Sequence, residues 1–406
     1  MRYHESMTTY QADSQLHAIT NPEIFHVDRQ RGFLPAPDPL DCLPPAFTPW
    51  EEIAHTLPKL LVAGTLRHTL EQLPTLKGAT LQDLAQLERA MMLLSYFGHA
   101  YVWAEEKPAD RIPAGIAVPW HAVAQQLGRP PILSYASYAL HNWRRLDPAG
   151  PIALGNIVLR QNFLAGVDEE WFILVHVDIE AKVAPALLAL GPAQTAVVTD
   201  HGQELEHQLT TVASALECAY ATLLRMPERC DPYIYYHRVR PYIHGWKNHP
   251  ALPQGVIYEG VEAYGGTPQQ FRGETGAQSS IIPALDAALG ITHEDDPLRL
   301  YLMEMRDYMP PAHRAFIAAI EQGPPVRQYV IAHRHDQPGL RDAYNACVHW
   351  IGRFRSTHLE YAGRYIHQQS QHSPDNPTDV GTGGTPFMPY LKKHRDETLA
   401  HLAAQG

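Results

Sequence analysis

The most regular pattern of apolar positions lies near the C-terminal end of the chain. From Leu340 onward, apolar or aromatic residues recur at alternating intervals of four and three, which places them on one face of an α-helix. The series runs through Tyr344, Cys347, Ile351, Phe354, His358, Tyr361 and Tyr365. It predicts a long amphipathic helix that carries one imidazole, that of His358, on its buried face.

Helical spacing also dominates the rest of the chain. It is clearest in LQDLAQLERAMMLLSYFGHAYVWA (81–104), in PPILSYASYALHNW (130–143) and in EEWFILVHVDIEAKVAPALLAL. The alternation that is typical of strands is scarce, so the sequence predicts an all-α protein. We place a small helical N-terminal domain with its proline-spaced connector at 1–128, and a large helical domain at 129–406. The glycine-rich, polar stretch at 369–385 is predicted to be a mobile loop.

Composition and charge narrow the classes of function. The chain has 406 residues, 45% of them hydrophobic, which is enough to bury a large core. The formal net charge of −11 argues against a broad basic surface, so we expect no nucleic-acid partner. The first residues lack a signal-peptide pattern and no apolar run approaches a membrane span, so we expect a cytoplasmic protein without a membrane partner. The four widely spaced cysteines argue against a zinc ribbon and covalently bound haem.

The imidazole of His358 needs a partner if it is buried. Burying an imidazole without one costs roughly 1–3 kcal/mol, so its nitrogens must be hydrogen-bonded or coordinated. One interpretation is a core histidine bonded to a backbone carbonyl. The other is the single axial ligand of a b-type haem, since the porphyrin supplies the other four nitrogens. The pattern alone leaves both open.

Several segments together resemble one known family. They are PPILSYASYALHNW, GWKNHPALPQGVIYEG, GAQSS, MRDYMPPAHRAF, GLRDAYNACV, RSTHLEYAGRYI and GTGGT. In this order they resemble indoleamine 2,3-dioxygenase over most of the chain, most densely from 130 to 388. The resemblance implies an all-α fold with a small N-terminal domain and a large haem-binding C-terminal domain. It also implies that O₂ and an external reductant are used to convert L-tryptophan to N-formylkynurenine.

The resemblance assigns residues to the cofactor. His358 occupies the position of the axial ligand to the iron of heme b (iron protoporphyrin IX). Arg355, one turn earlier, is paired with Asp286, and Trp246 is expected nearby on the same side of the haem.

It also assigns residues to the substrate. Tryptophan presents a carboxylate and an aromatic ring, so its site needs a forked cation and apolar walls. Arg240 and Thr382 of GTGGT match the positions that hold the carboxylate, and Pro241 is expected to distort the helix after Arg240. The positions that match the wall of the pocket are Tyr235, Tyr236, Tyr135, Tyr138, Ala139 and Phe172. Without the resemblance, these would be an ordinary ion-pairing arginine, a flexible linker and core aromatic residues.

His176 departs from the family, which usually carries serine at this position over the distal face of the haem. The related tryptophan 2,3-dioxygenases use a distal histidine that bonds the indole N–H, so we single out His176 as the catalytic candidate. The alternative is a hydrogen-bonded histidine in an apolar segment.

His176 and Asp178 also form H-x-D, a fragment of the two-histidine, one-carboxylate site of non-haem iron oxygenases. The same spacing recurs at His26 and Asp28, and 24 histidines make such matches frequent by chance. Non-haem sites of this kind usually lie in a β-barrel, whereas the flanking pattern here is helical. We therefore reject this assignment.

Three functions are compatible with these observations. The first is a haem dioxygenase that opens the indole C2–C3 bond of L-tryptophan or a close analogue. The second is a haem enzyme of secondary metabolism that mono-oxygenates or rearranges a modified indole, which the polar residues Tyr138, Tyr235, Tyr236 and His176 suggest. The third is a non-catalytic sensor of haem or tryptophan.

Overall fold

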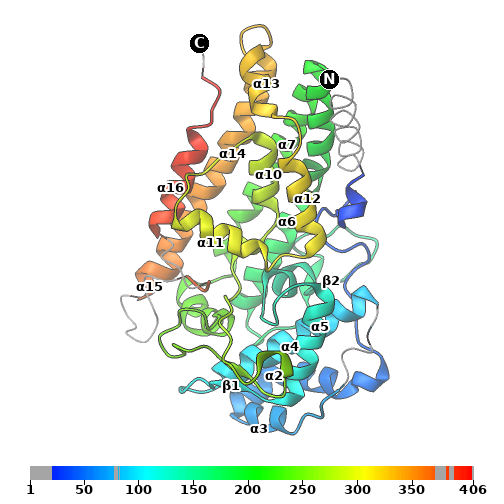
Figure 1. Cartoon of the computed structure of the whole chain (residues 1–406), viewed down its shortest axis with the longest axis vertical. Helices are drawn as coiled ribbons and strands as arrows, with labels where there is room; N and C mark the ends of the chain where they lie inside the picture. The colour runs from blue at the N-terminus through cyan, green and yellow to red at the C-terminus, as the bar shows by residue number, and fades with distance from the viewer. Residues whose placement is uncertain (1–20, 77–80, 82, 371–380, 384–387, 405–406) are drawn as a thin grey trace.

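The computed structural model describes residues 21–76, 81, 83–370, 381–383 and 388–404. Helices form nearly all of the regular structure of these residues, which confirms the all-α prediction (Figure 1). The N-terminal helices lie at one end of the elongated molecule, and the long helices of the C-terminal part lie side by side toward the other. None of the described helices is long and apolar enough to cross a membrane.

The N-terminal part is built around the buried helix α4. Its elements are the 3₁₀-helices η1 (Pro22–Phe25) and η2 (Pro45–Phe47) and the helices α2 (Thr48–Ala63), α3 (Leu66–Glu71), α4 (Leu84–Trp103) and α5 (Ala114–Leu127). α4 begins at its N-cap Asp83, whose carboxylate accepts from the backbone N–H of Ala85 at 2.7 Å. Gly98 permits close packing, because a Cβ there would lie 2.1 Å from the ring of Trp120 on α5.

The core beneath these helices extends beyond the first 128 residues. Buried side chains of 130–163 and 243–261 complete it, as do Met305 and Tyr308. Two short strand pairs connect these segments: β1 (Arg111–Ile112) pairs in parallel with β4 (Ile257–Tyr258), and β2 (Trp143–Arg145) pairs antiparallel with β3 (Ile157–Leu159). α5 ends at Leu127, but the proposed domain boundary at 128 stays a prediction.

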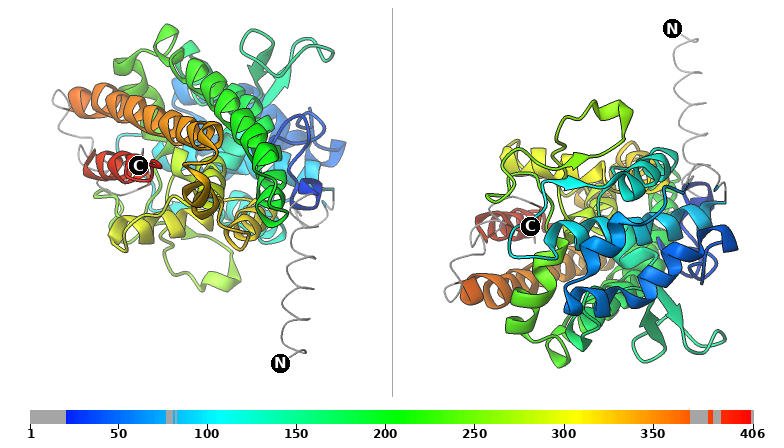
Figure 2. Two further views of the ribbon diagram at one scale, coloured as in Figure 1. Left: turned by 90° about the horizontal axis from the view of Figure 1, so that it is seen from above. Right: turned by 90° about the horizontal axis from the view of Figure 1, so that it is seen from below.

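A second core joins the long helices of the C-terminal part. The helix α6 (Val167–Val198) packs against α7 (Gly202–Leu223), and α7 packs against α14 (Pro338–Ala362) (Figure 2). α14 also contacts α16 (Met388–Leu399). Further helices are α10 (Ile281–Leu289), α11 (Pro297–Arg306), α12 (Pro311–Glu321), α13 (Val326–His333) and α15 (Gln368–Ser370), with the 3₁₀-helices η5 (Met226–Glu228), η7 (Glu262–Tyr264) and η8 (Gly276–Gln278).

Two predicted helices are shorter or more broken than expected. In 130–143 only a π-helical turn forms, η4 (Ala136–Leu140), because Pro130 and Pro131 lack backbone donors and Trp143 already belongs to β2. Farther along, the helix α8 (Pro232–Ile234) passes into a π-helical turn, η6 (Tyr235–Val239), and then into α9 (Arg240–Ile243). The helix is thus irregular next to Pro241, but the irregular turn precedes Arg240, whereas the prediction placed the distortion after it.

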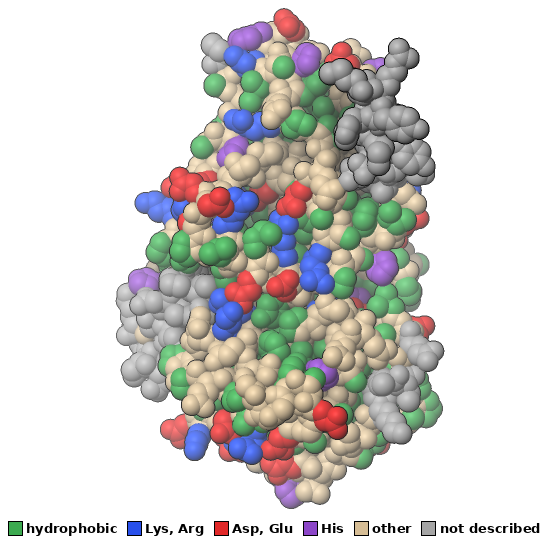
Figure 3. All heavy atoms as spheres, in the orientation of Figure 1, with side chains coloured by type: hydrophobic (Ala, Val, Ile, Leu, Met, Phe, Trp, Pro, Cys, Tyr) green, Lys and Arg blue, Asp and Glu red, His purple; other side chains and the backbone are tan. Residues whose placement is uncertain are grey.

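The predicted C-terminal helix is present as α14. It is followed directly by a third π-helical turn, η9 (Gly363–His367). The predicted loop at 369–385 falls largely outside the described residues. On the face shown in Figure 3, basic and acidic side chains are interspersed rather than gathered into one basic patch.

Candidate functional site

A cavity of about 220 Å³ lies where α6, α14 and α16 meet the π-helical turn η6. Its remaining walls come from the segments 274–277 and 381–383, from α11, and from the ends of α7, η5 and η9. Five of the residues predicted for the site line it: Phe172, His176, Tyr235, His358 and Thr382. These residues come from four separate elements, so the fold brings together side chains that are far apart in the sequence.

His358 faces this cavity from α14; its side chain is accessible from the cavity, while the protein around it desolvates the ring. The prediction of a buried imidazole was wrong, because the helix face turns from the core at Tyr344 and Ile351 toward the cavity at His358. None of the described residues makes a hydrogen bond to the imidazole. Desolvation and the nearby His176 lower the pKa of His358 to about 4. At neutral pH it therefore presents an uncharged ring with an available lone pair, the form that binds iron.

His176 lies on α6 in the same cavity. Its Nδ1 is 2.8 Å from the backbone oxygen of Phe172, four residues earlier. Because a carbonyl can only accept, Nδ1 carries the proton, and the neutral ring keeps Nε2 as an acceptor. Burial lowers the pKa of His176, although the bond to Phe172 opposes this. One nitrogen is thus satisfied by the backbone and the other can serve a ligand.

Aromatic rings form the wall around His176. The ring of Phe172 lies 4.7 Å from those of His176 and Tyr235, measured between centroids. Tyr135 and Tyr138 lie behind this wall, with ring centroids 5.9 Å from His176 and 6.4 Å from Phe172 respectively. Ala139 is buried on the same π-helical turn as Tyr138. The structure therefore places Tyr135, Tyr138 and Ala139 in a second layer rather than in the lining itself.

Arg240 and Tyr236 are fully buried but do not line the cavity. The guanidinium carbon of Arg240 lies 5.4 Å from the centroid of the Tyr236 ring, which its charge favours. Burial lowers the pKa of Arg240, while both Tyr235 and Tyr236 act to raise it. Thr382 does line the cavity, and its Oγ1 donates to the backbone oxygen of Glu274 at 2.5 Å.

Arg355 and Asp286 form the predicted ion pair, with Nη2 and Oδ2 2.7 Å apart. His293, which the sequence did not single out, extends it: Nε2 is 3.2 Å from Asp286, and Nδ1 is 2.5 Å from Glu397 on α16. Burial acts to raise the pKa of Asp286, but Arg355 and His293 hold it below its usual value. This chain of contacts ties α14 to α10 and α16 beside the cavity.

Trp246 lies in a different environment. Its ring packs against His99 and Tyr258, with centroids 4.9 Å and 6.3 Å away, in the core of the N-terminal part. It is not among the residues that line the cavity. The reason is that the segment after α9 folds back over α5 instead of following α14. The predicted place of Trp246 beside His358 thus has no support in the arrangement of these side chains.

Among the lining residues that the sequence did not single out are one carboxylic acid and one histidine. Glu274 stands directly before Thr275 and the GAQSS segment, and His394 comes from α16. Glu274 lies just outside the segments that carry the family resemblance, and no local pattern marked it. His394 offered none, because its position depends on how α16 packs against α14.

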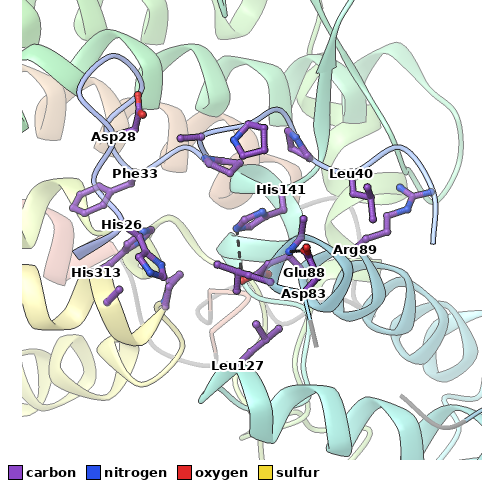
Figure 4. A pocket seen from close by; sticks show the side chains of 18 of the residues that line it. His26, Asp28, Phe33, Leu40, Asp83, Glu88, Arg89, Leu127, His141 and His313 are labelled. Carbon is purple, nitrogen blue, oxygen red and sulfur yellow. Dashed lines mark hydrogen bonds and ion pairs between the residues drawn. The ribbon is translucent and has the colours of Figure 1, made fainter. Parts of the chain in front are cut away.

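A second and larger cavity, of about 810 Å³, lies between the segment 33–40 and the ends of α4, α5 and α12 (Figure 4). His141 and Glu88 line it side by side, with Nε2 and Oε1 3.7 Å apart, and Arg129 forms an ion pair with the same carboxylate. None of the residues predicted for the site lines this cavity. We therefore regard the smaller cavity as the functional site despite its size.

The smaller cavity suits a haem by the chemistry of its walls. It offers one uncharged imidazole from α14, aromatic and aliphatic surfaces, and no cysteine among its described lining residues. A family model described as indoleamine 2,3-dioxygenase matches residues 21–401 of the chain. The chain belongs to the indoleamine 2,3-dioxygenase family. It is thus a haem-dependent dioxygenase of the indoleamine/tryptophan type.

Relatives within the indoleamine 2,3-dioxygenase family match over nearly the full length. Indoleamine 2,3-dioxygenase 1 of Rattus norvegicus is 38% identical, with 94% of this chain and 95% of the relative covered. Indoleamine 2,3-dioxygenase 2 of Homo sapiens is 35% identical over the same shares. A 6-hydroxytryptophan 2,3-dioxygenase of Fusarium equiseti is 32% identical, with 95% and 99% covered. The family therefore includes a relative named for a ring-hydroxylated indole substrate.

Proposed function

We propose that this protein opens the C2–C3 bond of the indole ring of L-tryptophan with O₂, giving N-formylkynurenine. The observation that carries the proposal is the pair of histidines in one cavity: His358 with no hydrogen bond from a described residue, and His176 with its Nε2 available. The first would hold the iron of heme b, and the second would accept from the indole N–H. An external reductant is the remaining partner of the reaction.

The residues of the chain would divide the work between cofactor and substrate. His358 would hold the iron, with Arg355 and Asp286 fixing the helix that carries it. Bound haem supplies the activation of O₂ needed to open the ring. Phe172 and Tyr235, whose rings pack on each other, would form one aromatic wall against which the indole lies, and their packing would exclude water from that side.

The polar groups of the substrate would be held at the opposite end of the site. Thr382 and Arg240, the forked cation, are the residues assigned to the carboxylate; the hydroxyl group of Thr382 would donate to it in exchange for its bond to the carbonyl of Glu274. Tyr135, Tyr138, Tyr236 and Ala139 would support this arrangement from behind the wall. His176 would accept from the indole N–H and so set the orientation of the ring.

One experiment tests the reaction. The purified haem-containing protein is mixed with L-tryptophan, ascorbate, methylene blue and air, and the absorbance of N-formylkynurenine is followed. Formation of this product, identified by mass, supports the proposal. Binding of tryptophan without any turnover would instead indicate a sensor.

A ring-modified tryptophan is the second candidate substrate. It is favoured by the polar groups that line the cavity, His176 and Tyr235 among them, and by the relative named for 6-hydroxytryptophan. Comparing kcat/KM for tryptophan and 6-hydroxytryptophan decides between them. A preference of tenfold or more for the hydroxylated substrate would assign the enzyme to secondary metabolism, whereas a mono-oxygenated product would indicate a different reaction.

Replacing His176 with serine is expected to lower kcat/KM for tryptophan several-fold, because one neutral hydrogen bond contributes about 1 kcal/mol. Protonation removes the acceptor at Nε2, so wild-type efficiency should fall as the pH drops through the lowered pKa of His176, below its ordinary value of 6.5. His176→Ser should flatten this acid limb. Because 1-methyltryptophan lacks the N–H, it should distinguish wild type from variant less than tryptophan does. Identical acid limbs and equal losses on both substrates would return His176 to the role of a core histidine.

A further inference from the structure

The carboxyl group of Glu274 lies in the wall of the cavity on a fixed stretch of backbone. Its N–H donates to the oxygen of Ile243 at the end of α9, at 3.1 Å, and its own carbonyl accepts from Thr382 Oγ1 at 2.5 Å. The residue is 4% exposed. The segment is also held tightly on its other side, since a Cβ on Gly273 would lie 2.1 Å from the backbone nitrogen of Gly245. The backbone that carries this side chain is therefore fixed by the fold, which keeps the side chain at the cavity wall.

Glu274 differs from the two other buried glutamates near the site. Glu169 accepts from the backbone N–H groups of Phe163 and Leu164 at 2.8 Å and 3.1 Å. Glu180 accepts from the hydroxyl groups of Tyr135 and Ser279, each at 2.9 Å. Within the described part of the chain, nothing makes a hydrogen bond or ion pair with the carboxyl group of Glu274. A partner for this carboxyl group would therefore have to come from a ligand in the cavity.

The surroundings of this carboxyl group are aromatic and uncharged. Burial is the main cause of the raised pKa of four tyrosines, and the charge of Glu274 adds to it: Tyr96, Tyr135, Tyr138 and Tyr235. Desolvation alone raises the pKa of Glu274 to about 8, with no cation acting against it. Ionising a carboxyl group in such surroundings costs free energy unless a ligand brings a positive charge close to it.

We propose that Glu274 binds the ammonium group of an α-amino acid substrate, and this rests on the proposed function. The carboxylate and ammonium groups of an amino acid share one carbon atom, so the residues that hold them must be neighbours. Thr382, assigned to the carboxylate, touches the backbone of Glu274 and satisfies this condition. Glu274 is then the residue that selects amino acids over other indole acids of the same shape.

The test uses the haem-containing protein and two ligands that differ only in the amine: L-tryptophan and indole-3-propionate. Calorimetry gives the dissociation constant of each. We expect wild type to bind tryptophan about tenfold or more tightly than indole-3-propionate, since the pair is a charge-assisted hydrogen bond. Glu274→Gln should lose most of this preference by weakening tryptophan alone.

The matched control is Glu169→Gln, which also removes a buried carboxylate but lies away from the cavity lining; its ligand preference should stay as in wild type. Equal weakening of both ligands by Glu274→Gln, or no change in either, would overturn the proposal while the dioxygenase activity of wild type stands. If Glu274→Gln does not fold, wild type alone decides: equal affinity for the two ligands excludes recognition of the ammonium. A wild type that turns over no indole substrate would reject the proposed function instead.

Discussion

Purified His358→Ala is expected to contain little or no haem. The imidazole of His358 is the single protein ligand that we assign to the iron, and alanine offers no atom that can replace it. Haem per chain is measured by the pyridine haemochrome method after purification with added haem. Circular dichroism should show an unchanged helical content, because the side chain faces a cavity and leaves little packing behind when it is removed.

The control for this variant is His349→Ala. His349 is exposed on the same helix, so its removal should leave the haem content at the wild-type level. Full haem occupancy and an unchanged ferrous spectrum in His358→Ala would show that another residue is the ligand. His176 and His394, which line the same cavity, would then be the residues to replace next.

Replacing Arg240 with alanine is expected to weaken tryptophan binding by about 2–4 kcal/mol, since a desolvated carboxylate would lose its charge-assisted partner. The dissociation constant and KM should both rise, while haem content stays normal. Arg238→Ala, which removes an exposed arginine two residues away, should leave both unchanged. Tryptophan affinity and turnover that survive in Arg240→Ala within a few-fold would remove Arg240 from the site. The variant therefore decides whether Arg240, which lies behind the cavity lining, takes part in substrate binding.

The sequence predicted the helix that carries His358, because seven positions in a row followed the helical interval of four and three. It did not predict that His358 would be exposed. Periodicity identifies the face of a helix but not whether that face meets a core or a cavity, which depends on the partner helices. For the same reason His394 could not be found, since it reaches the cavity only through the packing of α16 on α14.

Local chemistry explains the other successes and failures. Pro241 predicts an irregular helix because proline lacks a backbone N–H donor, and a π-helical turn precedes it. The prolines at 130 and 131 carry the same signal for 130–143, whereas the apolar spacing of that segment predicts a helix. The place of Trp246 came from the family resemblance alone, and the folding back of the segment after α9 moves it to the other core. The position of Glu274 in the cavity wall also depends on the course of this segment, which no local pattern specifies.

The ion pair of Arg355 with Asp286 has a consequence for how α14 tolerates change. Each residue of an α-helix turns the chain by roughly 100°, so Arg355 and His358 keep a fixed angle only while three steps separate them. Asp286 holds Arg355 from α10, and this contact fixes the rotation of α14 about its own axis. A residue inserted or deleted between the two would rotate one side chain relative to the other. Either Arg355 would then no longer meet Asp286, or His358 would no longer face the cavity. The spacing of these two side chains is therefore as much a part of the site as their chemistry.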